Sequence, residues 1–251
     1  MDIYAFPPVA AILSAAYSFL MQLAQLLEPL AGAAAAATAV ILLTLLVRAA
    51  LIPVGISQAK AEQTRSRLAP KLKALQQKHK KDPERLQRET MKLYADEKAS
   101  PFAGCLPMLA QAPVVAIVYA VFLHPAIAGH PNALLAHHLF GVPLGASVVG
   151  SIASGTATAA TFTVFALVIA VIVVVAELTR RAFRLPSDGD AAAGPLAGAG
   201  MARVAGALQF TTAVFALFVP LAAALYLATT VAWTLAQRVI LRRRYPLETT
   251  V

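Results

Sequence analysis

Long stretches without a charged side chain limit how this chain can fold. No Asp, Glu, Lys or Arg occurs between Leu139 and Ala176, and residues 33–56 contain only one, Arg48. Over the whole chain 13% of the residues are charged and 59% are hydrophobic, whereas an ordinary soluble domain is about 25% charged. Because about 20 apolar residues in a helix cross a bilayer, the sequence excludes an ordinary soluble domain. It predicts an all-α membrane protein with several spans.

The basic residues form three clusters, which predict the topology. Of the 21 basic residues, twelve lie between Lys60 and Lys98, four at 180–203 and four at 238–244. Basic loops stay on the cytoplasmic side, so an even number of crossings separates the clusters. The net charge of +9 is therefore a topology signal. It does not indicate the continuous basic surface of a nucleic-acid-binding protein.

Five spans satisfy this parity, with an outer N-terminus and a cytoplasmic C-terminus. The first half of the uncharged stretch 139–176 is rich in Gly, Ser and Thr, so we expect one span there and not two. Pro220 marks a tight outer turn between two short spans. The predicted segments are an outer interfacial amphipathic helix (1–30), a first span (31–56), a cytoplasmic helical hairpin (57–100), a second span (101–124), an outer loop (125–159), a third span (160–178), a cytoplasmic linker (179–203), a fourth span (204–219), a fifth span (220–239) and a cytoplasmic tail (240–251).

The N-terminal apolar segment carries a polar stripe. Ser14, Ser18, Gln22 and Gln25 recur at spacings of four, four and three residues, which places them on one helix face. Such a helix lies in the plane of the membrane interface. A sixth span at 9–27 is the alternative, and it would change only the side on which the N-terminus lies.

The hydrophilic segment 57–100 predicts an antiparallel helical hairpin. Asp82-Pro83 suits an N-cap followed by proline in the first helical position, and Ser100-Pro101 ends the second helix. Pro70 kinks or restarts the first arm. The segment is either a solvated connector that only sets topology or a docking surface beside anionic lipid headgroups. Its apolar seam consists of Leu68, Leu72 and Leu75 in the first arm and Leu86, Thr90 and Leu93 in the second.

Arg48 is the strongest candidate for a functional residue. It lies eight residues before the end of the first span at Ile56, about 12 Å along a helix, which is farther than its side chain reaches. Arginine in lipid costs at least ~2.5 kcal/mol, so we expect a water-filled groove open to the cytoplasm. Pairing with Glu177, or thinning of the bilayer, would be the alternatives. The polar side chains expected to line this groove with Arg48 are Thr44, Gln111, Thr229, Thr230 and Gln237.

Nothing in the sequence indicates an enzyme, a metal site or a cofactor. Gly145-Ala146-Ser147 resembles part of an intramembrane serine-protease signature, but no histidine lies at depth in a span to act as its base. The loop histidines match no metal-ligand spacing: His124, His130, His137 and His138.

Taken in order, these residues resemble the YidC/Oxa/Alb family of membrane protein insertases. Residues 40–124 carry the resemblance, through TLLVR in the first span and the segment ASPFAGCLPMLAQAP after the hairpin. LFGVPLG (139–145) is similar to the family's outer loop. The final span departs from the family pattern, with Leu227 after Tyr226, Thr229-Thr230 for a Ser-Asn pair, and Trp233 as the only tryptophan.

The resemblance implies a bacterial inner-membrane insertase and chaperone that works without ATP. Its groove would contain Arg48, Thr44, Gln111, Thr229, Thr230, Trp233 and Gln237. Nascent single-span and hairpin membrane proteins would be its substrates, with anionic lipids, the Sec translocon and the ribosome as candidate partners. Basic side chains of the hairpin would recruit the substrate: Lys71, Lys73, Lys78, Lys80, Lys81 and Arg85.

Two other classes of protein remain as alternatives. A small anion transporter or channel would use Arg48 as its selectivity charge, and it would open to both faces and contain an internal repeat. The sequence shows no repeat. A structural assembly partner would tolerate the loss of Arg48.

Overall fold

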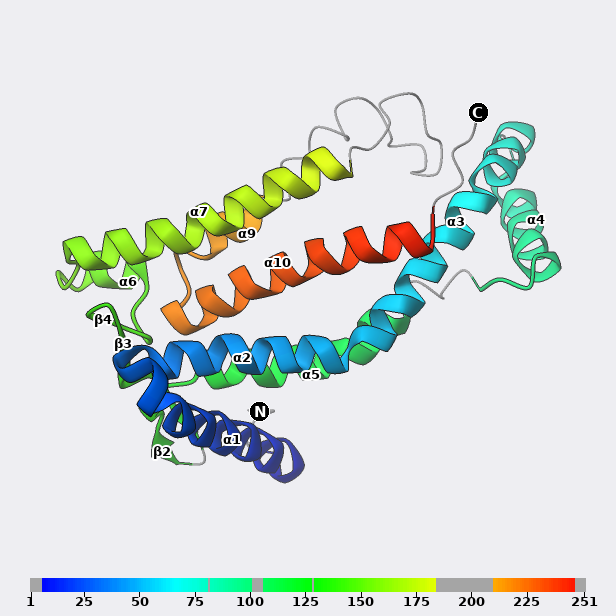
Figure 1. Cartoon of the computed structure of the whole chain (residues 1–251). Coiled ribbons are helices and arrows are strands. Elements are labelled where there is room, and N and C mark those ends of the chain that lie inside the picture. Colours follow the sequence, from blue (N-terminus) through cyan, green and yellow to red (C-terminus); the bar gives the residue numbers. More distant parts are fainter. Residues whose placement is uncertain (1–5, 81, 101–105, 128, 184–209, 247–251) are drawn as a thin grey trace. The chain divides into compact units, whose positions relative to one another are not determined.

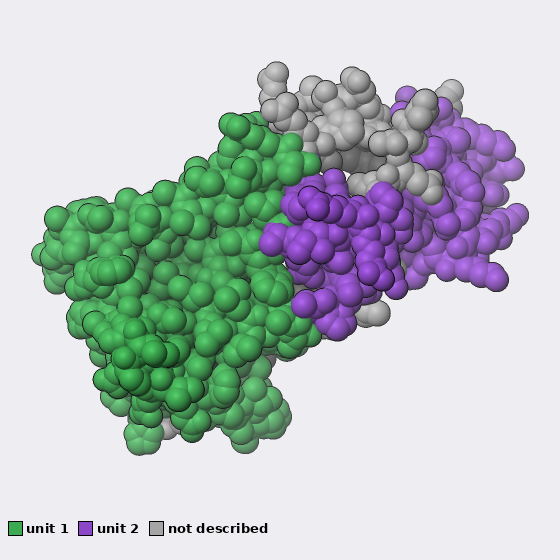
Figure 2. Space-filling view, in the orientation of Figure 1, with its two compact units in different colours: residues 1–50, 112–182, 208–235 green, residues 51–111, 183–207, 236–251 purple. Residues whose placement is uncertain are grey.

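The computed structural model describes residues 6–80, 82–100, 106–127, 129–183 and 210–246, with the backbone alone at 106–108, 110 and 111. The chain divides into two compact units (Figure 2). Unit 1 comprises residues 1–50, 112–182 and 208–235, and unit 2 comprises residues 51–111, 183–207 and 236–251. Most of the apolar segments lie in unit 1, whereas the predicted hairpin lies in unit 2.

Helices make up most of the described chain (Figure 1). The long helices are α1 (Pro7–Ala31), α2 (Ala35–Ala50), α3 (Ile52–Lys78), α4 (Pro83–Asp96), α5 (Leu106–Leu123), α7 (Ala159–Ala182) and α10 (Leu221–Arg244). Short helices lie between them: η2 (Gly32–Ala34), η3 (Ala133–Ala136), α6 (Val148–Ala153) and α9 (Thr211–Phe215). The strands pair as two small antiparallel hairpins, β1 (Ala126–Ile127) with β2 (His130–Pro131) and β3 (His138–Leu139) with β4 (Val142–Pro143).

Three helical stretches of the described residues are long and apolar enough to cross a membrane: Pro7–Ala50, Ala159–Ala182 and Leu221–Arg244. Helix α5 adds a shorter apolar segment, Ala112–Leu123. The prediction of a mainly helical membrane protein is confirmed, and the number of five spans stays a prediction. The predicted fourth span begins outside the described residues, which resume at Phe210 with a turn and α9.

Helix α1 folds back beside α2 (Figure 1). Gly32 stands between the two helices with a φ of +51°, a conformation that glycine adopts without strain. The contact face of α1 contains Leu13, Leu20 and Ala24, all buried. The polar stripe lies largely outside this face, since Ser18, Gln22 and Gln25 are exposed and Ser14 is half-buried. Whether α1 lies in the interface or spans the membrane stays a prediction.

Helix α7 has one packed face and one apolar outer face. Its buried residues recur at helical spacing: Thr161, Val164, Phe165, Val168, Ile172 and Ala176. The opposite face exposes large apolar side chains, among them Phe162, Leu167 and Val174. Helix α7 is therefore apolar on both its packed face and its outer face. A helix that is hydrophobic all round is buried in a core or a membrane, so the outer face of α7 suits contact with lipid.

The predicted outer loop is ordered and caps α10, which begins directly after Pro220, where the sequence predicts a turn. The N–H groups of Leu221 and Ala222 donate to the carbonyls of Ala146 (2.8 Å) and Leu144 (2.9 Å). These two N–H groups have no partner within their own helix, so the loop satisfies them. Ser147 caps α6 by accepting a hydrogen bond from the Gly150 N–H at 3.0 Å, which gives this serine a structural role.

Side chains in unit 1 are buried most completely near the end that carries the loop 124–158, called the loop end below. In α2 the buried residues lie between Ala35 and Thr44, and none follows in that helix. In α10 they lie between Leu221 and Ala228. In the part of α5 that belongs to unit 1, they lie between Val118 and Phe122. These three helices therefore pack tightly at the loop end and more loosely away from it.

Unit 2 contains the predicted hairpin, formed by α3 and α4. Leu68 of the predicted seam is fully buried, and the other five seam residues are half-buried. The cap at Asp82 is confirmed, because its Oδ1 accepts a hydrogen bond from the Arg85 N–H at 3.0 Å and Pro83 follows it. Helix α3 runs through Pro70 without restarting.

The predicted end of the second arm at Ser100-Pro101 was wrong. Helix α4 ends earlier, at Asp96. Two residues later, Lys98 adopts a left-handed φ of +50°. The Ala99 N–H then reaches the Tyr94 carbonyl at 2.9 Å, and the Lys98 N–H reaches the Ala95 carbonyl at 3.0 Å. Such a left-handed cap usually contains Gly or Asn, so a lysine there gave no signal in the sequence.

Candidate functional site

Arg48 lies in the last turn of α2, on the loosely packed side of Thr44. Its side chain is half-buried, and among the described residues it makes no hydrogen bond or ion pair. Thr44, one turn earlier on the same face, is 1% exposed and donates to the Val40 carbonyl at 2.7 Å. Leu51 interrupts the helical path directly after α2.

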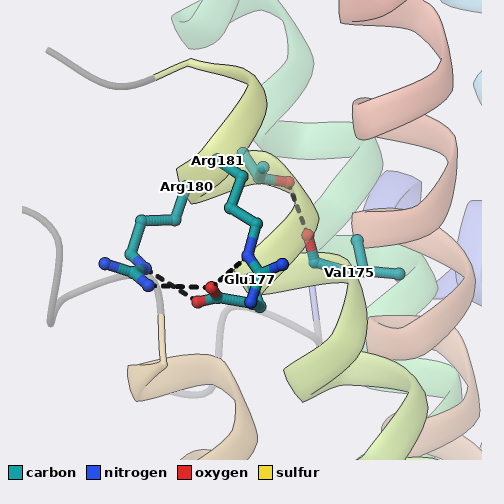
Figure 3. Close-up of polar contacts among 5 residues, drawn as sticks. Val175, Glu177, Arg180 and Arg181 are labelled. Atoms are coloured by element: carbon teal, nitrogen blue, oxygen red, sulfur yellow. Dashed lines mark hydrogen bonds and ion pairs between the residues drawn. The ribbon is translucent and has the colours of Figure 1, made fainter.

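Glu177 does not pair with Arg48, which was the main structural alternative. Its carboxylate oxygens accept hydrogen bonds from Nε (2.7 Å) and Nη2 (2.8 Å) of Arg180 and from Nε of Arg181 (2.6 Å), as Figure 3 shows. The three residues lie within a single turn of α7, so they meet without tertiary contacts. Glu177 is thus occupied within its own helix, and Arg48 keeps its charge available.

The predicted groove residues of α10 fall into both units. Thr229 donates to the Leu225 carbonyl at 2.8 Å, and Thr230 and Trp233 are half-buried in unit 1. Gln237 belongs to unit 2, where its amide lies directly against Gly55 of α3. A side chain at position 55 would occupy the space of this amide, so the close approach requires glycine. The side chain of Gln111 lies outside the described part.

The hydroxyl of Tyr119 was not among the predicted site groups. Within the described part of the chain this atom is buried and has no hydrogen-bond partner, and the same is true of Thr230 Oγ1. The Tyr119 ring lies 6.2 Å from the ring of Tyr226, centroid to centroid. A tyrosine in an otherwise apolar span was the available signal, because buried phenol groups usually find a partner.

The predicted recruitment residues of the hairpin are mostly exposed. Lys78, Lys80 and Arg85 are exposed and Lys73 is half-buried, whereas Lys81 lies outside the described residues. Lys71 forms an ion pair with Glu97, and Arg67 does the same at 3.3 Å. Both pairs cross from α3 to the residue after α4, so they join the two arms of the hairpin.

The ion pair of Glu97 predicts a pH-dependent hairpin. The hydrogen bond from Lys71, with its positive charge, holds the pKa of Glu97 below its ordinary value of 4.5. A carboxylate with a lowered pKa stabilises the folded form above its unfolded pKa, and this stabilisation is lost as the pH falls through the folded value. We expect the arms to be joined at neutral pH and to separate as the pH falls through the lowered pKa of Glu97.

Spin labels on the exposed positions Gln77 and Gln87, in a Cys105→Ser background, measure this separation. The distance distribution in the full-length protein should be narrow at pH 7 and should broaden below the pKa of Glu97. Glu97→Gln should give the broad distribution at every pH. A distribution that stays narrow in this variant would show that the apolar seam alone joins the arms.

A set of contacts in unit 2 joins the start of α3 to the end of α10. Glu62 pairs with Arg242 at 3.2 Å, and the Gln63 amide donates to the Pro246 carbonyl at 3.0 Å. Arg242 and Arg238 also lie over the ring of Phe183, at 4.4 and 5.2 Å from its centroid. The sequence did not indicate Phe183, whose only local signal was an aromatic residue after a basic run.

The described fold and charge distribution define a class: an integral, mainly helical membrane protein with a helical hairpin and an unpaired arginine in an apolar helix. Residues 26–248 match the family model described as 60Kd inner membrane protein. The chain belongs to this family, the YidC/Oxa/Alb family. The resemblance of the first span and the segment after the hairpin is therefore confirmed.

Curated relatives of the chain have the name membrane protein insertase YidC. The Clostridium perfringens protein is 43% identical over 83 residues, which are 33% of this chain and 35% of that protein. The Streptomyces avermitilis protein is 29% identical over 222 residues, 82% of this chain and 51% of that protein. The Aquifex aeolicus protein is 42% identical over 84 residues, 34% of this chain and 17% of that protein. The matched segments thus span about half or less of the length of these relatives.

Proposed function

We propose that this protein is a membrane protein insertase that moves nascent single-span and hairpin proteins from the cytoplasm into the bilayer without ATP. One observation carries the proposal: Arg48 is a half-buried cation in an apolar helix, and the counter-ion considered for it, Glu177, is engaged by Arg180 and Arg181. An ionisable group inside a membrane marks a functional site by default. The names of the relatives support the same function.

The chemical task is to lower the cost of carrying a polar segment past the hydrocarbon. An acidic side chain at the centre of a bilayer costs several kcal/mol, and a wet groove replaces part of its hydration. Arg48 attracts acidic residues of the translocated segment, while the apolar part of the substrate moves into lipid along α7 and α10. Because water screens the charge, this attraction is about 1–2 kcal/mol, between the bulk-water and protein-surface values.

The hairpin and the loop end of unit 1 have different parts in this proposal. The hairpin of α3 and α4, on the cytoplasmic side, captures the substrate through exposed basic residues such as Lys78, Lys80 and Arg85. The tightly packed loop end of unit 1 closes the groove toward the outside. Anionic lipid headgroups lie beside the basic clusters, and the Sec translocon and the ribosome are proposed partners.

Reconstitution of the purified protein into vesicles without ATP tests the function. We expect a radiolabelled single-span substrate to become protected from added protease in these vesicles and to remain exposed with empty ones. The same vesicles should show no chloride flux above background. Chloride flux without insertion would contradict the insertase function. It would favour an anion channel in which Arg48 selects for anions.

A further inference from the structure

Two buried hydroxyl groups of unit 1 stand out because they are unpaired: that of Tyr119, which no prediction included, and that of Thr230, which was predicted to line the groove. Tyr119 Oη in α5 and Thr230 Oγ1 in α10 are both buried and have no hydrogen-bond partner among the described residues. Apolar residues of the same shape, phenylalanine and valine, would fill these positions without burying an unpaired polar atom. Most buried polar groups in proteins are paired. We therefore expect these two hydroxyls to bind a partner from outside the described chain.

Thr230 differs from most of the described helical threonines in where its hydroxyl points. Seven of them donate to the carbonyl four residues earlier, which is the local bond that a helix offers. For Thr230 that acceptor would be the carbonyl of Tyr226, and the bond is not made. The neighbouring Thr229 makes the equivalent bond to Leu225 at 2.8 Å. The Thr230 hydroxyl is therefore directed away from its own helix backbone.

Tyr119 and Thr230 are both neighbours of the same aromatic residue, Tyr226. The ring of Tyr119 is 6.2 Å from that of Tyr226, and Thr230 is one turn farther along α10 on the same face. Side chains in a helix lean toward its N-terminus. Because α5 ends at the loop end, the Tyr119 hydroxyl leans away from that end, in the direction in which α10 runs from Tyr226 to Thr230.

The position of Thr230 along α10 matches that of Thr44 along α2. Thr230 follows the first residue of α10 by nine positions, and Thr44 follows the first residue of α2 by the same number, about 13.5 Å along each axis. Both helices begin at the loop end, and Arg48 lies one turn farther from it than Thr44. The buried residues of α10 end at Ala228 and those of α2 at Thr44. Thr230 thus follows the last buried residue of α10, and Tyr119 lies next to Val118, where the buried residues of α5 in unit 1 begin.

We propose that Tyr119 and Thr230 form a polar stop at the closed end of the groove, where their hydroxyls hydrogen-bond peptide groups of the substrate's translocated segment. The proposal rests on the insertase function and adds a class of ligand to it: the backbone N–H and C=O groups of an extended polypeptide. Arg48 recognises acidic side chains, whereas the stop recognises any polar stretch of chain. It therefore sets how readily neutral polar segments are accommodated.

The double variant Tyr119→Phe/Thr230→Val removes both hydroxyls and keeps the shapes of the side chains. Reconstituted into vesicles, it should insert a substrate with a neutral polar translocated segment roughly tenfold more slowly than the wild type, the effect of losing two ordinary hydrogen bonds. Insertion of a matched substrate with an apolar segment should stay unchanged. The melting temperature should stay equal or rise, because an unpaired buried hydroxyl destabilises the fold. Thr163→Val is the matched control, since Thr163 is exposed on α7 and bonds only its own helix.

The possible results separate this proposal from the function on which it rests. If the wild type is active and the double variant inserts both substrates equally well, the proposed polar stop is wrong, whereas the proposed insertase function is retained. A lower melting temperature of the double variant would also overturn the stop, because the hydroxyls would then hold the fold together. A wild type that inserts neither substrate would contradict the insertase, and the stop with it.

Discussion

Replacement of Arg48 by alanine should slow the insertion of substrates with an acidic translocated segment by roughly tenfold, whereas lysine should preserve most of the rate. A factor of ten corresponds to about 1.4 kcal/mol, which lies between the attraction of two charges in bulk water and near a protein surface. Arg48 makes no intramolecular ion pair within the described chain, so its loss leaves no partner charge unpaired. The expected effect is on the substrate and not on the fold.

A pair of substrates isolates the electrostatic contribution of Arg48 to insertion. The acidic residues of the translocated segment are replaced by their amides in one member, and the amide form should respond little to Arg48→Ala. Arg243→Ala is the matched control, because it removes the same charge from an exposed position near the end of α10. Equal insertion of the acidic substrate by wild type and Arg48→Ala would remove Arg48 from the mechanism.

Local signals in the sequence predicted the parts of the fold that depend on neighbouring residues. Asp82 and Pro83 predicted the start of α4, because an N-cap and a proline act within one turn. Pro220 predicted the start of α10 for a similar reason. The end of α4 was wrong, since a left-handed Lys98 ends the helix before Ser100 is reached. Lysine rarely adopts this conformation, so nothing local predicted it.

The parts of the site that depend on contacts between distant residues were only partly predictable. Arg48 was found because a charge in an apolar stretch is conspicuous, and the structure adds that Glu177 is occupied by Arg180 and Arg181. The unpaired hydroxyl of Tyr119 and the stacking of Arg242 on Phe183 depend on how separate helices meet. No spacing rule within one helix carries that information.

The hairpin likewise combines local and distant determinants. Its leucine seam and its basic exterior follow from helical periodicity, and both are present in α3 and α4. The ion pairs of Glu97 with Lys71 and Arg67 were not predicted. They arise because the chain continues past α4 and returns to α3, which a helix-by-helix interpretation of the sequence does not describe.

The most direct test of the central claim is the side from which water reaches position 48. Arg48→Cys in a Cys105→Ser background is reconstituted in a known orientation, and a membrane-impermeant thiol reagent is added from one side at a time. A water-filled groove closed at its outer end predicts that labelling occurs from the cytoplasmic side only. Labelling from both sides would indicate a channel, and labelling from neither side would show that Arg48 lies in a dry core; either result would contradict the groove.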